Sequence, residues 1–238
     1  ILKLCEEYKD TIVAIKVRQS REIVKERGLE PLKAAVDIAV EAGLPVVVHA
    51  TDSPGEIRDT LDILRPGDVF CHCFHQKGHT IIGKDQHVLP EVFAAQKRGV
   101  LFDCAHGSMN FSMKVASQAF ADGFYPDIVS SDLSMLSLMK PPAYSLSHIM
   151  TELLNMGMPF EKILPCVTAT PAKQIGMASD GFLLPGAPAD VAVFRQEERH
   201  FHLKDRYGNE QEANQILRPM LTIRNGIVLY RQCDFFNL

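Results

Sequence analysis

The sequence predicts an α/β fold built around a parallel sheet, and three observations carry this prediction. Short apolar runs alternate with amphipathic stretches at a spacing of roughly 25 to 33 residues, the length of one βα unit. Four of the runs end near a lysine, histidine or aspartate, and chemistry on parallel α/β scaffolds gathers at the carboxyl ends of the strands. The 238 residues, 46% of them apolar, are enough to bury a large core.

Five βα units fit this alternation. Strands are expected near 11–17, 45–49, 68–74, 99–104 and 127–131, and helices near 31–42, 55–64, 86–98, 112–122 and 145–156. Gly43 and Gly99 stand where a helix needs a left-handed terminating residue. An eight-stranded barrel needs more strands than these, and the first ten residues resemble the end of a helix that leads into a strand. We therefore expect a (β/α)8 TIM-type barrel that is incomplete at its N-terminus.

The pattern changes after the fifth unit. Thr170 and Pro171 predict the cap and first turn of a short helix, and the segment 220–229 predicts a hairpin on an Asn-Gly turn. The charged stretch 195–215 between the apolar segments is expected to be a solvated excursion. The expected division is a barrel portion over 1–178, with about five βα units and a C-terminal helix, and a C-terminal β portion with a tail over 179–238.

Composition limits the class of partner. The net charge is −4 with acidic and basic residues interspersed, so neither a nucleic-acid-binding stripe nor a polybasic membrane patch is visible. A small-molecule substrate is therefore expected, and homo-oligomerisation is left open. The six cysteines are scattered through apolar segments, which predicts free thiols in the cytoplasm. No leader and no apolar span of about 18 residues argues for export or membrane insertion.

Lys16 is unusual because it lies inside an apolar run that a parallel sheet would bury on both faces. Burial without a partner favours the neutral amine. Such an amine can react with carbon dioxide to give a carbamate, whose two oxygens can bridge two metal ions. The alternative, favoured for Lys16 alone, is a lysine at a strand end that extends to solvent or pairs with a carboxylate.

Two histidines follow apolar runs and could bind a metal. His49 closes the run 44–48, and neutral imidazole is a good zinc ligand; a hydrogen-bonded histidine at a strand end is the alternative. In the next run, strand alternation puts residues 71, 73 and 75 on one side and 72 and 74 on the other, which makes His72 the ligand. A structural zinc site would instead use Cys71, Cys73, His75 and His79, although its spacing is atypical and buried cysteines that fill space explain the run more simply.

Asp132 follows the run 127–131, where a carboxylate can bind a metal and accept a proton from bound water. Its alternative is an Asx turn or cap. Asp127 would lie at the opposite end of the strand. His106 follows the preceding strand and could contact the substrate or its leaving group, or be an ordinary loop histidine. The joint pattern matters most, since four strand ends present ligand types that suit one divalent-metal pocket.

Several short motifs occur together and in order: Ala14-Ile15-Lys16-Val17-Arg18, Val48-His49-Ala50, His72-Cys73-Phe74, Phe102-Asp103 with His106-Gly107, Ser131-Asp132-Leu133, Thr168 to Pro171, and Leu184-Pro185-Gly186 with Ala189-Asp190. In these motifs, over nearly its whole length, the chain resembles the amidohydrolase superfamily, specifically its dihydroorotase-like and deacetylase-like metallohydrolases. The resemblance implies that 1–178 is a portion of a metallohydrolase barrel and that 179–238 contains a portion of a small C-terminal β-sandwich and a tail.

The resemblance implies two divalent ions, with zinc as the default by ligand type and manganese or iron as alternatives. Lys16 as a carbamate would bridge them, His49 and His72 would hold one, and Asp132 would bind the other and act as general base and then acid. A metal-bridging hydroxide would attack the substrate. Arg18 is a candidate to bind a substrate carboxylate, with a surface arginine as its alternative.

The implied reaction is cleavage of an amide or ester in an acyl amino acid, an acetylated hydroxy acid or a cyclic amide. The alternatives are a purine-type deaminase on the same scaffold and a catalytically silent scaffold or binding relative. One departure stands out: the superfamily has a His-x-His pair on its first barrel strand. Here His200-Phe201-His202 has that spacing but lies in the charged stretch, so the pair is expected upstream of Ile1.

Overall fold

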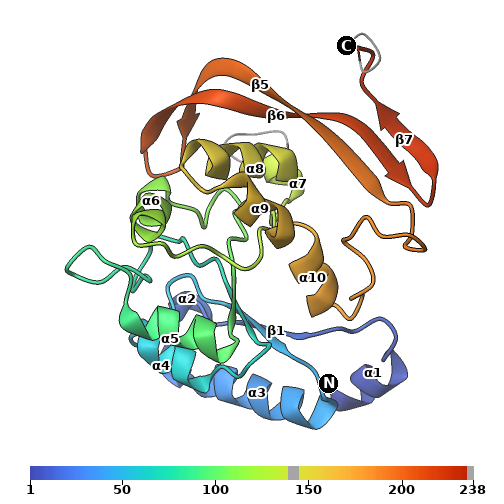
Figure 1. Ribbon diagram of the computed structural model, residues 1–238. Helices are drawn as coiled ribbons and strands as arrows, with labels where there is room; N and C mark the ends of the chain where they lie inside the picture. Colours follow the sequence, from blue (N-terminus) through green and yellow to red (C-terminus); the bar gives the residue numbers. More distant parts are fainter. Residues whose placement is uncertain (139–144, 235–238) are drawn as a thin grey trace.

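The computed structural model describes residues 1–138 and 145–234 (Figure 1). The lower part of the molecule in Figure 1, called the lower body below, is built on a four-stranded parallel sheet in the order β1-β2-β3-β4. These strands are β1 (Ile15–Arg18), β2 (Val46–His49), β3 (Val69–Cys71) and β4 (Leu101–Asp103). The prediction of an α/β fold with a parallel sheet is confirmed, although each strand is shorter than expected. The order of the strands in space is their order in the chain, as in consecutive strands of a barrel.

Each of the five predicted units has a helix: α3 (Glu30–Ala42), α4 (Ile57–Ile63), α5 (Pro90–Arg98), α6 (Met113–Ala121) and α8 (Leu146–Asn155). Gly43 and Gly99 end α3 and α5 with φ of 66° and 103°, as predicted. Further helical segments are α1 (Leu2–Glu7), α2 (Arg21–Val24), the 3-10 turn η1 (Lys25–Arg27), α7 (Met135–Leu138), α9 (Phe160–Cys166) and α10 (Ala169–Gln174). No helix among the described residues has both the length and the apolar character to cross a membrane.

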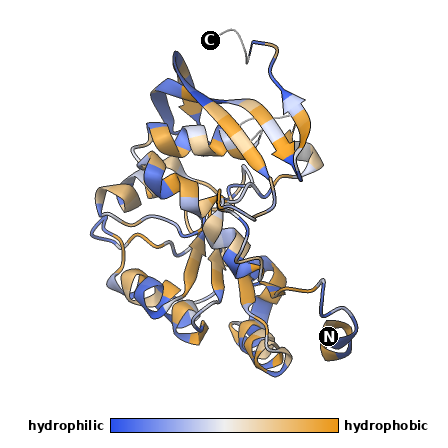
Figure 2. Ribbon diagram, turned by 45° about the vertical axis from the view of Figure 1, so that its right-hand side comes forward, coloured by the Kyte–Doolittle hydropathy of each residue, from blue (hydrophilic) through white to orange (hydrophobic). Residues whose placement is uncertain are grey.

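The strand register divides the sheet into two faces. Val17, Val48, Phe70 and Phe102 are in register across the four strands, and the last three are fully buried. Side chains in register on parallel strands point to the same side, so this row forms the core under the helices. Figure 2 shows the strands as the hydrophobic centre of the lower body. The neighbouring row, one residue further along each strand, faces the opposite side and carries the chemistry.

The predicted fifth strand over 127–131 is only an extended segment. One parallel bridge joins Asp103 to Ile128, and the Cys104 amide donates to the Ile128 carbonyl at 3.0 Å. The Asp127 carboxylate accepts the Phe102 amide at 2.9 Å, so a side chain takes the place of a ladder carbonyl there. The segment still runs parallel to β4 and delivers Asp132 to the carboxyl edge, with Asp127 at the other end.

The C-terminal part corrects one prediction and confirms another. The stretch 195–215 is not a solvated excursion, because β5 (Val191–Lys204) and β6 (Glu210–Arg224) form a long antiparallel hairpin, and β7 (Ile227–Arg231) completes a three-stranded sheet. Leu203 and Leu217 from this hairpin are buried in the core, and the hairpin lies over α8 in Figure 1. A few widely spaced apolar residues that pack in the core are therefore enough to keep this charged segment in a β-strand. The predicted turn is confirmed, since Asn225 and Gly226 have φ of 48° and 77°.

Two further predictions concern the helix near 170 and the cysteines. The short helix exists as α10, but it begins two residues earlier than predicted, with Thr168 rather than Thr170 at the cap position. The Thr168 hydroxyl donates to the Leu164 carbonyl at 2.7 Å and so continues the preceding turn instead of capping the next. All six cysteines are free thiols, as predicted.

Candidate active site

One row of side chains marks the carboxyl edge of the sheet. Arg18, His49, Cys71 and Asp103 are in register at the ends of β1 to β4. Because in-register side chains of parallel strands point to the same side, a cation, an imidazole, a thiol and a carboxylate project from one edge. This is the edge at which parallel α/β proteins place their chemistry.

The two predicted histidine ligands face each other there. His49 Nδ1 lies 2.8 Å from His72 Nε2, and His72 Nδ1 lies 2.7 Å from the Ala105 carbonyl oxygen. A carbonyl only accepts, so His72 Nδ1 carries the hydrogen and Nε2 turns its lone pair toward His49. The Ala105 carbonyl thus fixes the tautomer of His72, as a carbonyl commonly does for metal-bound histidine.

Burial keeps this pair neutral. It lowers the pKa of His49 to about 3, and the nearby charges of His72, Arg18 and Lys16 act in the same direction. Burial also lowers the pKa of His72, while the Ala105 carbonyl and the Asp132 carboxylate oppose the shift. Neutral imidazole is the form that binds a metal, so both rings are available as ligands at neutral pH.

The alternation argument that separated His72 from Cys71 is wrong. β3 ends at Cys71, and His72 adopts a left-handed backbone with φ of 68°. The change of conformation breaks the alternation of the strand, so the ring of His72 reaches the same edge as Cys71. A β-strand period cannot be extended past the last strand residue, and a strained residue beyond it is often functional.

Lys16 also departs from expectation. The structure leaves Lys16 exposed, because β1 is the edge strand of the described sheet. Its amine lies 3.5 Å from Cys71 Sγ and acts electrostatically on both histidines. The predicted burial is therefore wrong, whereas the predicted position beside the histidine pair is met. Carbamate formation on Lys16 stays a prediction.

Asp132 reaches the same edge from the segment beside β4. It is exposed and left-handed, with φ of 46°, and its charge acts on both His72 and Cys71. The carboxylate rests against Gly107, where a Cβ atom would lie 2.3 Å from Asp132 Oδ2. Lys16, His49, His72 and Asp132 are thus brought together by four separate segments, while their metal-binding roles stay predictions.

The other two predicted residues are placed differently. Arg18 lies on the edge beside His49, and its guanidinium pairs with Glu22 at 3.0 Å with both side chains more than half exposed. His106 is fully buried behind the edge, where its Nε2 lies 2.8 Å from Glu152 Oε2. A substrate contact through His106 would require this pair to separate, and it stays a prediction.

Sequence reasoning missed Asp103 as a member of the edge. Asp103 is buried, and its carboxylate accepts the Ser130 hydroxyl at 2.8 and 3.0 Å and the Ala105 amide at 2.9 Å. Burial raises its pKa, and the Ser130 hydrogen bonds oppose the rise. The thiol of Cys71 lies between Asp103 and Lys16, at 4.0 and 3.5 Å. The available signal was an aspartate that ends an apolar run, the same signal that selected Asp132.

The residues of the edge fit a bound cation in part. Two ring nitrogens that share a cation through bonds of about 2.0–2.1 Å lie about 3 Å apart, close to the separation of the His49 and His72 nitrogens. Over residues 1–138 and 145–234, no group of three or more His, Cys, Asp or Glu side chains is arranged as a complete metal site. This includes the alternative structural zinc site, for which His79 instead pairs with Glu56 at 3.1 Å. The histidine pair is therefore the core of the candidate metal centre.

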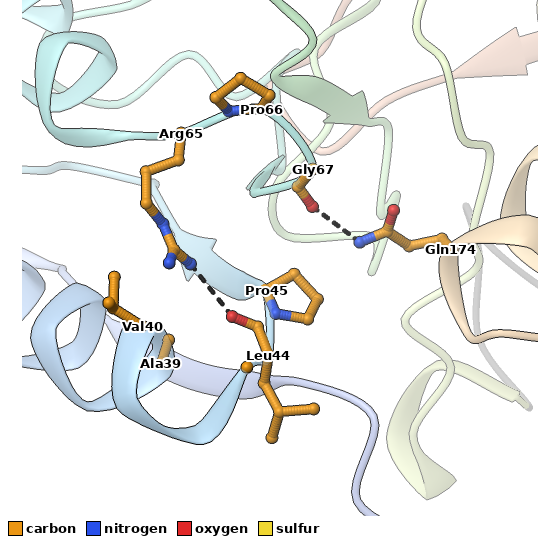
Figure 3. Close-up of a pocket in the computed structure, with 9 residues that line it drawn as sticks. Ala39, Val40, Leu44, Pro45, Arg65, Pro66, Gly67 and Gln174 are labelled. Atoms are coloured by element: carbon orange, nitrogen blue, oxygen red, sulfur yellow. Dashed lines mark hydrogen bonds between the residues drawn. The ribbon is translucent and has the colours of Figure 1, made fainter.

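A cavity of about 450 Å³ lies at the amino ends of the strands instead. Figure 3 shows it between the end of α3, the turn before β3 and α10. The Arg65 guanidinium donates to the Leu44 carbonyl at 3.1 Å, and Gln174 donates to the Gly67 carbonyl at 2.8 Å. In parallel α/β barrels this edge serves stability, so we assign no chemistry to this cavity.

Acid should destabilise the metal-free protein through its buried histidines. His75 is fully buried, and burial lowers its pKa to about 4. Between pH 6.5 and pH 4, histidine in the unfolded chain, with a pKa of 6.5, binds a proton, whereas the folded His75 ring does not. The free energy of unfolding therefore decreases as the pH falls from 6.5 toward 4. For His75 alone, the free energy of unfolding should drop by about 2 kcal/mol between pH 7 and pH 5. Urea unfolding at a series of pH values in chelator measures it.

The variant His75→Gln serves as the comparison, because it has no imidazole to protonate. Its free energy of unfolding should depend less steeply on pH over the same interval. Equal slopes for the parent and the variant would show that the His75 ring does not contribute. His49 and His72 add to the parent slope in the same direction, since burial lowers both of their pKa values.

Comparison with known proteins gives relatives of one kind. No protein-family model matches the chain. A protein named deacetylase from Brucella anthropi is 32% identical over 94% of the chain, and one from Agrobacterium fabrum is 33% identical over 94%. The chain covers 55% and 54% of these relatives, so it spans about half the length of the curated relatives it matches.

Two solved structures are similar over nearly the whole chain. A crystal structure of an adenine deaminase matches 98% of the chain and 63% of its own length, with a TM-score of 0.91 and 29% identity. A crystal structure of a dihydroorotase matches 98% of the chain and 60% of its own length, with a TM-score of 0.85 and 30% identity.

Proposed function

We propose that this protein is a metal-dependent hydrolase of amides or esters. The proposal takes as its premise a relationship to the amidohydrolase superfamily. The similarity of the chain to deacetylases, a dihydroorotase and an adenine deaminase supports that premise. That similarity supports hydrolase or deaminase chemistry in general. The observation that carries the finer proposal is the pair of neutral imidazoles, His49 and His72, whose facing nitrogens lie 2.8 Å apart beside Lys16 and Asp132.

In the proposed site, His49 and His72 would hold one divalent cation, zinc by the preference of imidazole, and Lys16 and Asp132 would complete the set for two ions. When bound, the metals supply an activated water and polarise the scissile carbonyl. The protein's own residues prepare this chemistry. The Ala105 carbonyl orients His72, and Asp103 holds the Cys71 thiol near the Lys16 amine. We assign the carbamate to Lys16 because its amine lies beside His49 and His72, where a carbamate would be within reach of a cation held by the two rings.

Asp132 moves the proton. Its carboxylate is exposed at the edge and directed by contact with the Gly107 backbone. It takes the proton of the attacking water and returns it to the leaving amine or alcohol, which makes one carboxylate both base and acid. Arg18, on the same edge, can bind an acidic substrate through its forked donors if the substrate carboxylate replaces Glu22 as its partner. Acyl amino acids and acetylated hydroxy acids carry such a carboxylate.

The test combines metal content with a substrate panel. The protein is loaded with zinc or manganese in bicarbonate, and bound metal per chain is measured by mass spectrometry. N-acetyl amino acids, O-acetyl hydroxy acids and cyclic amides are then assayed for acid release. We expect metal uptake, acid release from at least one class, and loss of both in His72→Ala. The control His87→Ala, which removes an exposed histidine paired with Asp122 at 2.9 Å, should leave both unchanged.

A second candidate is a purine-type deaminase, favoured by the TM-score of 0.91 to an adenine deaminase. It predicts ammonia release from a purine with no acid release from the acyl panel. A protein that takes up no metal and turns over neither panel would contradict both enzyme proposals and favour a silent binding relative.

A further inference from the structure

A buried imidazole–carboxylate pair lies behind the candidate active site. His106 and Glu152 are 0% and 1% exposed, and His106 Nε2 lies 2.8 Å from Glu152 Oε2. The His106 ring stacks on Phe111 with ring centroids 4.2 Å apart. A buried carboxylate is costly without a partner, and a buried pair is weak evidence of a contribution to stability. None of the steps proposed above uses this pair.

Both nitrogens of the His106 ring are occupied. The Ser108 amide donates to Nδ1 at 3.3 Å, so Nδ1 accepts and Nε2 carries the hydrogen that Glu152 receives. With Phe111 against its face, the ring has no freedom to turn. The pair therefore fixes the loop that begins after β4, at Cys104, and continues through Ser108.

This loop in turn holds the segment that carries Asp132. The His106 amide donates to the Ser130 carbonyl at 3.1 Å, and the Gly107 amide donates to the Ser131 carbonyl at 3.0 Å. Ser131 directly precedes Asp132. Gly107 also forms the surface on which the Asp132 carboxylate rests, since its missing Cβ would lie 2.3 Å from Asp132 Oδ2.

Backbone strain shows that this arrangement must be held from outside. Ala105 and Asp132 are both left-handed, with φ of 38° and 46°. Such conformations in residues other than glycine persist only where surrounding contacts impose them. Two side chains form hydrogen bonds to the loop from elsewhere in the fold: His72, which donates to the Ala105 carbonyl, and Glu152 of α8, which accepts from the His106 ring. That helix is anchored in turn to the C-terminal hairpin, because the Leu217 amide donates to the Thr151 hydroxyl at 3.0 Å.

We propose that Glu152 is a positioning residue for Asp132, acting through His106 and the Gly107 backbone. The proposal rests on the proposed function in that it takes Asp132 as the proton-transfer group. It gives α8 a role in setting the geometry of the active site. Glu152 makes no contact with the substrate in this role.

The test compares Glu152→Leu, which leaves the His106 Nε2 hydrogen without an acceptor, with Glu152→Gln, whose amide oxygen can still accept it. The first readout is hydrogen exchange of the Gly107 amide in the protein without substrate. Glu152→Leu should raise its exchange rate by about tenfold or more, since the hydrogen bond to Ser131 then opens locally. Glu152→Gln should stay close to the parent.

The second readout is steady-state kinetics on the best substrate of the acyl panel. Glu152→Leu should lower kcat by about 10- to 100-fold with KM little changed, because a displacement of about 1 Å in a catalytic group costs up to that factor. Glu152→Gln should recover most of kcat. If Glu152→Leu does not fold, Glu152→Asp, with its carboxylate withdrawn by one methylene, should show a smaller loss of the same kind.

Thr151→Val is the matched control, because it changes the neighbouring residue on α8 and removes the two hydrogen bonds of the Thr151 hydroxyl, from the Leu217 amide and to the Ser147 carbonyl, while Asn155 still joins α8 to the hairpin. It should lower the melting temperature without changing Gly107 exchange or kcat. The proposal would be overturned if Glu152→Leu behaved like Thr151→Val. Failure of the proposed function looks different, since the parent protein itself would then take up no metal and hydrolyse nothing, while Gly107 exchange would still report on the pair.

Discussion

Replacing Asp132 by asparagine should lower kcat/KM by about 10² to 10⁴-fold while the protein folds normally. Asparagine has nearly the same shape and can keep the contact with Gly107, but its amide cannot accept the proton of the attacking water. Asp132 is exposed and, within residues 1–138 and 145–234, has no ion pair on which folding depends, so the loss should fall on the reaction and not on stability. Initial-rate kinetics and a thermal melt of the same preparation check both parts.

Asp127→Asn is the matched control for this prediction. Asp127 lies on the same segment at the opposite edge of the sheet, where its carboxylate accepts the Phe102 amide at 2.9 Å and the Gln96 side chain at 3.1 Å. Its replacement should change stability and leave kcat/KM within a small factor of the parent. Asp132→Asn with more than about a tenth of the parent activity would fall outside the range of a proton-transfer group and remove Asp132 from that role.

The order of strands and helices along the chain could be predicted because it depends on short-range sequence patterns. Runs of β-branched and apolar residues predicted β1 to β4, and Gly43 and Gly99 predicted the ends of two helices. The hairpin at Asn225 needed only its turn residues. Local signals could not predict where a side chain replaces a backbone group as hydrogen-bond acceptor. At the predicted fifth strand, the Asp127 carboxylate accepts the Phe102 amide in place of a backbone carbonyl.

The long β5–β6 hairpin was missed for a related reason. Its strand carries many charges, and buried positions such as Leu203 recur too sparsely to reveal a period of two. Only packing against α8 and α6 makes those positions a core. Charge patterning predicts solvent exposure of a residue, but it does not predict whether the backbone between exposed residues is paired.

The candidate site shows where spacing arguments stop. The rule that residues at the carboxyl ends of parallel strands meet at one edge correctly placed His49, His72 and Asp132 together. That rule depends only on the parallel topology. The assignment of faces beyond the strand failed at His72, whose left-handed backbone no period describes. The burial of Lys16 failed because burial depends on what covers an edge strand. Glu152, the buried partner of the loop residue His106, lies 46 residues further along the chain on α8, and no pattern in the sequence indicated the pair.

The largest expected loss of stability comes from Asp68→Ala, at the edge opposite the candidate site. Asp68 is fully buried and accepts the Val46 amide at 2.7 Å and the Arg65 amide at 2.8 Å. It also receives the Arg65 guanidinium through Nε at 3.0 Å and Nη2 at 2.8 Å. Its removal leaves buried donors unpaired at the start of two strands, and breaking such a pair costs about 3–5 kcal/mol, with the lower value expected because Arg65 is 30% exposed.

Urea unfolding should therefore give Asp68→Ala a lower midpoint with the same slope, a change in stability without a change in the surface exposed. Asp62→Ala is the control, because its partner Arg58 lies four residues away and both side chains are about two-thirds exposed, at 67% and 66%. An exposed pair of this kind contributes about 0.3–0.5 kcal/mol. Equal effects of the two substitutions would mean that burial does not distinguish the pairs, and that the Asp68 carboxylate does not join the starts of β2 and β3.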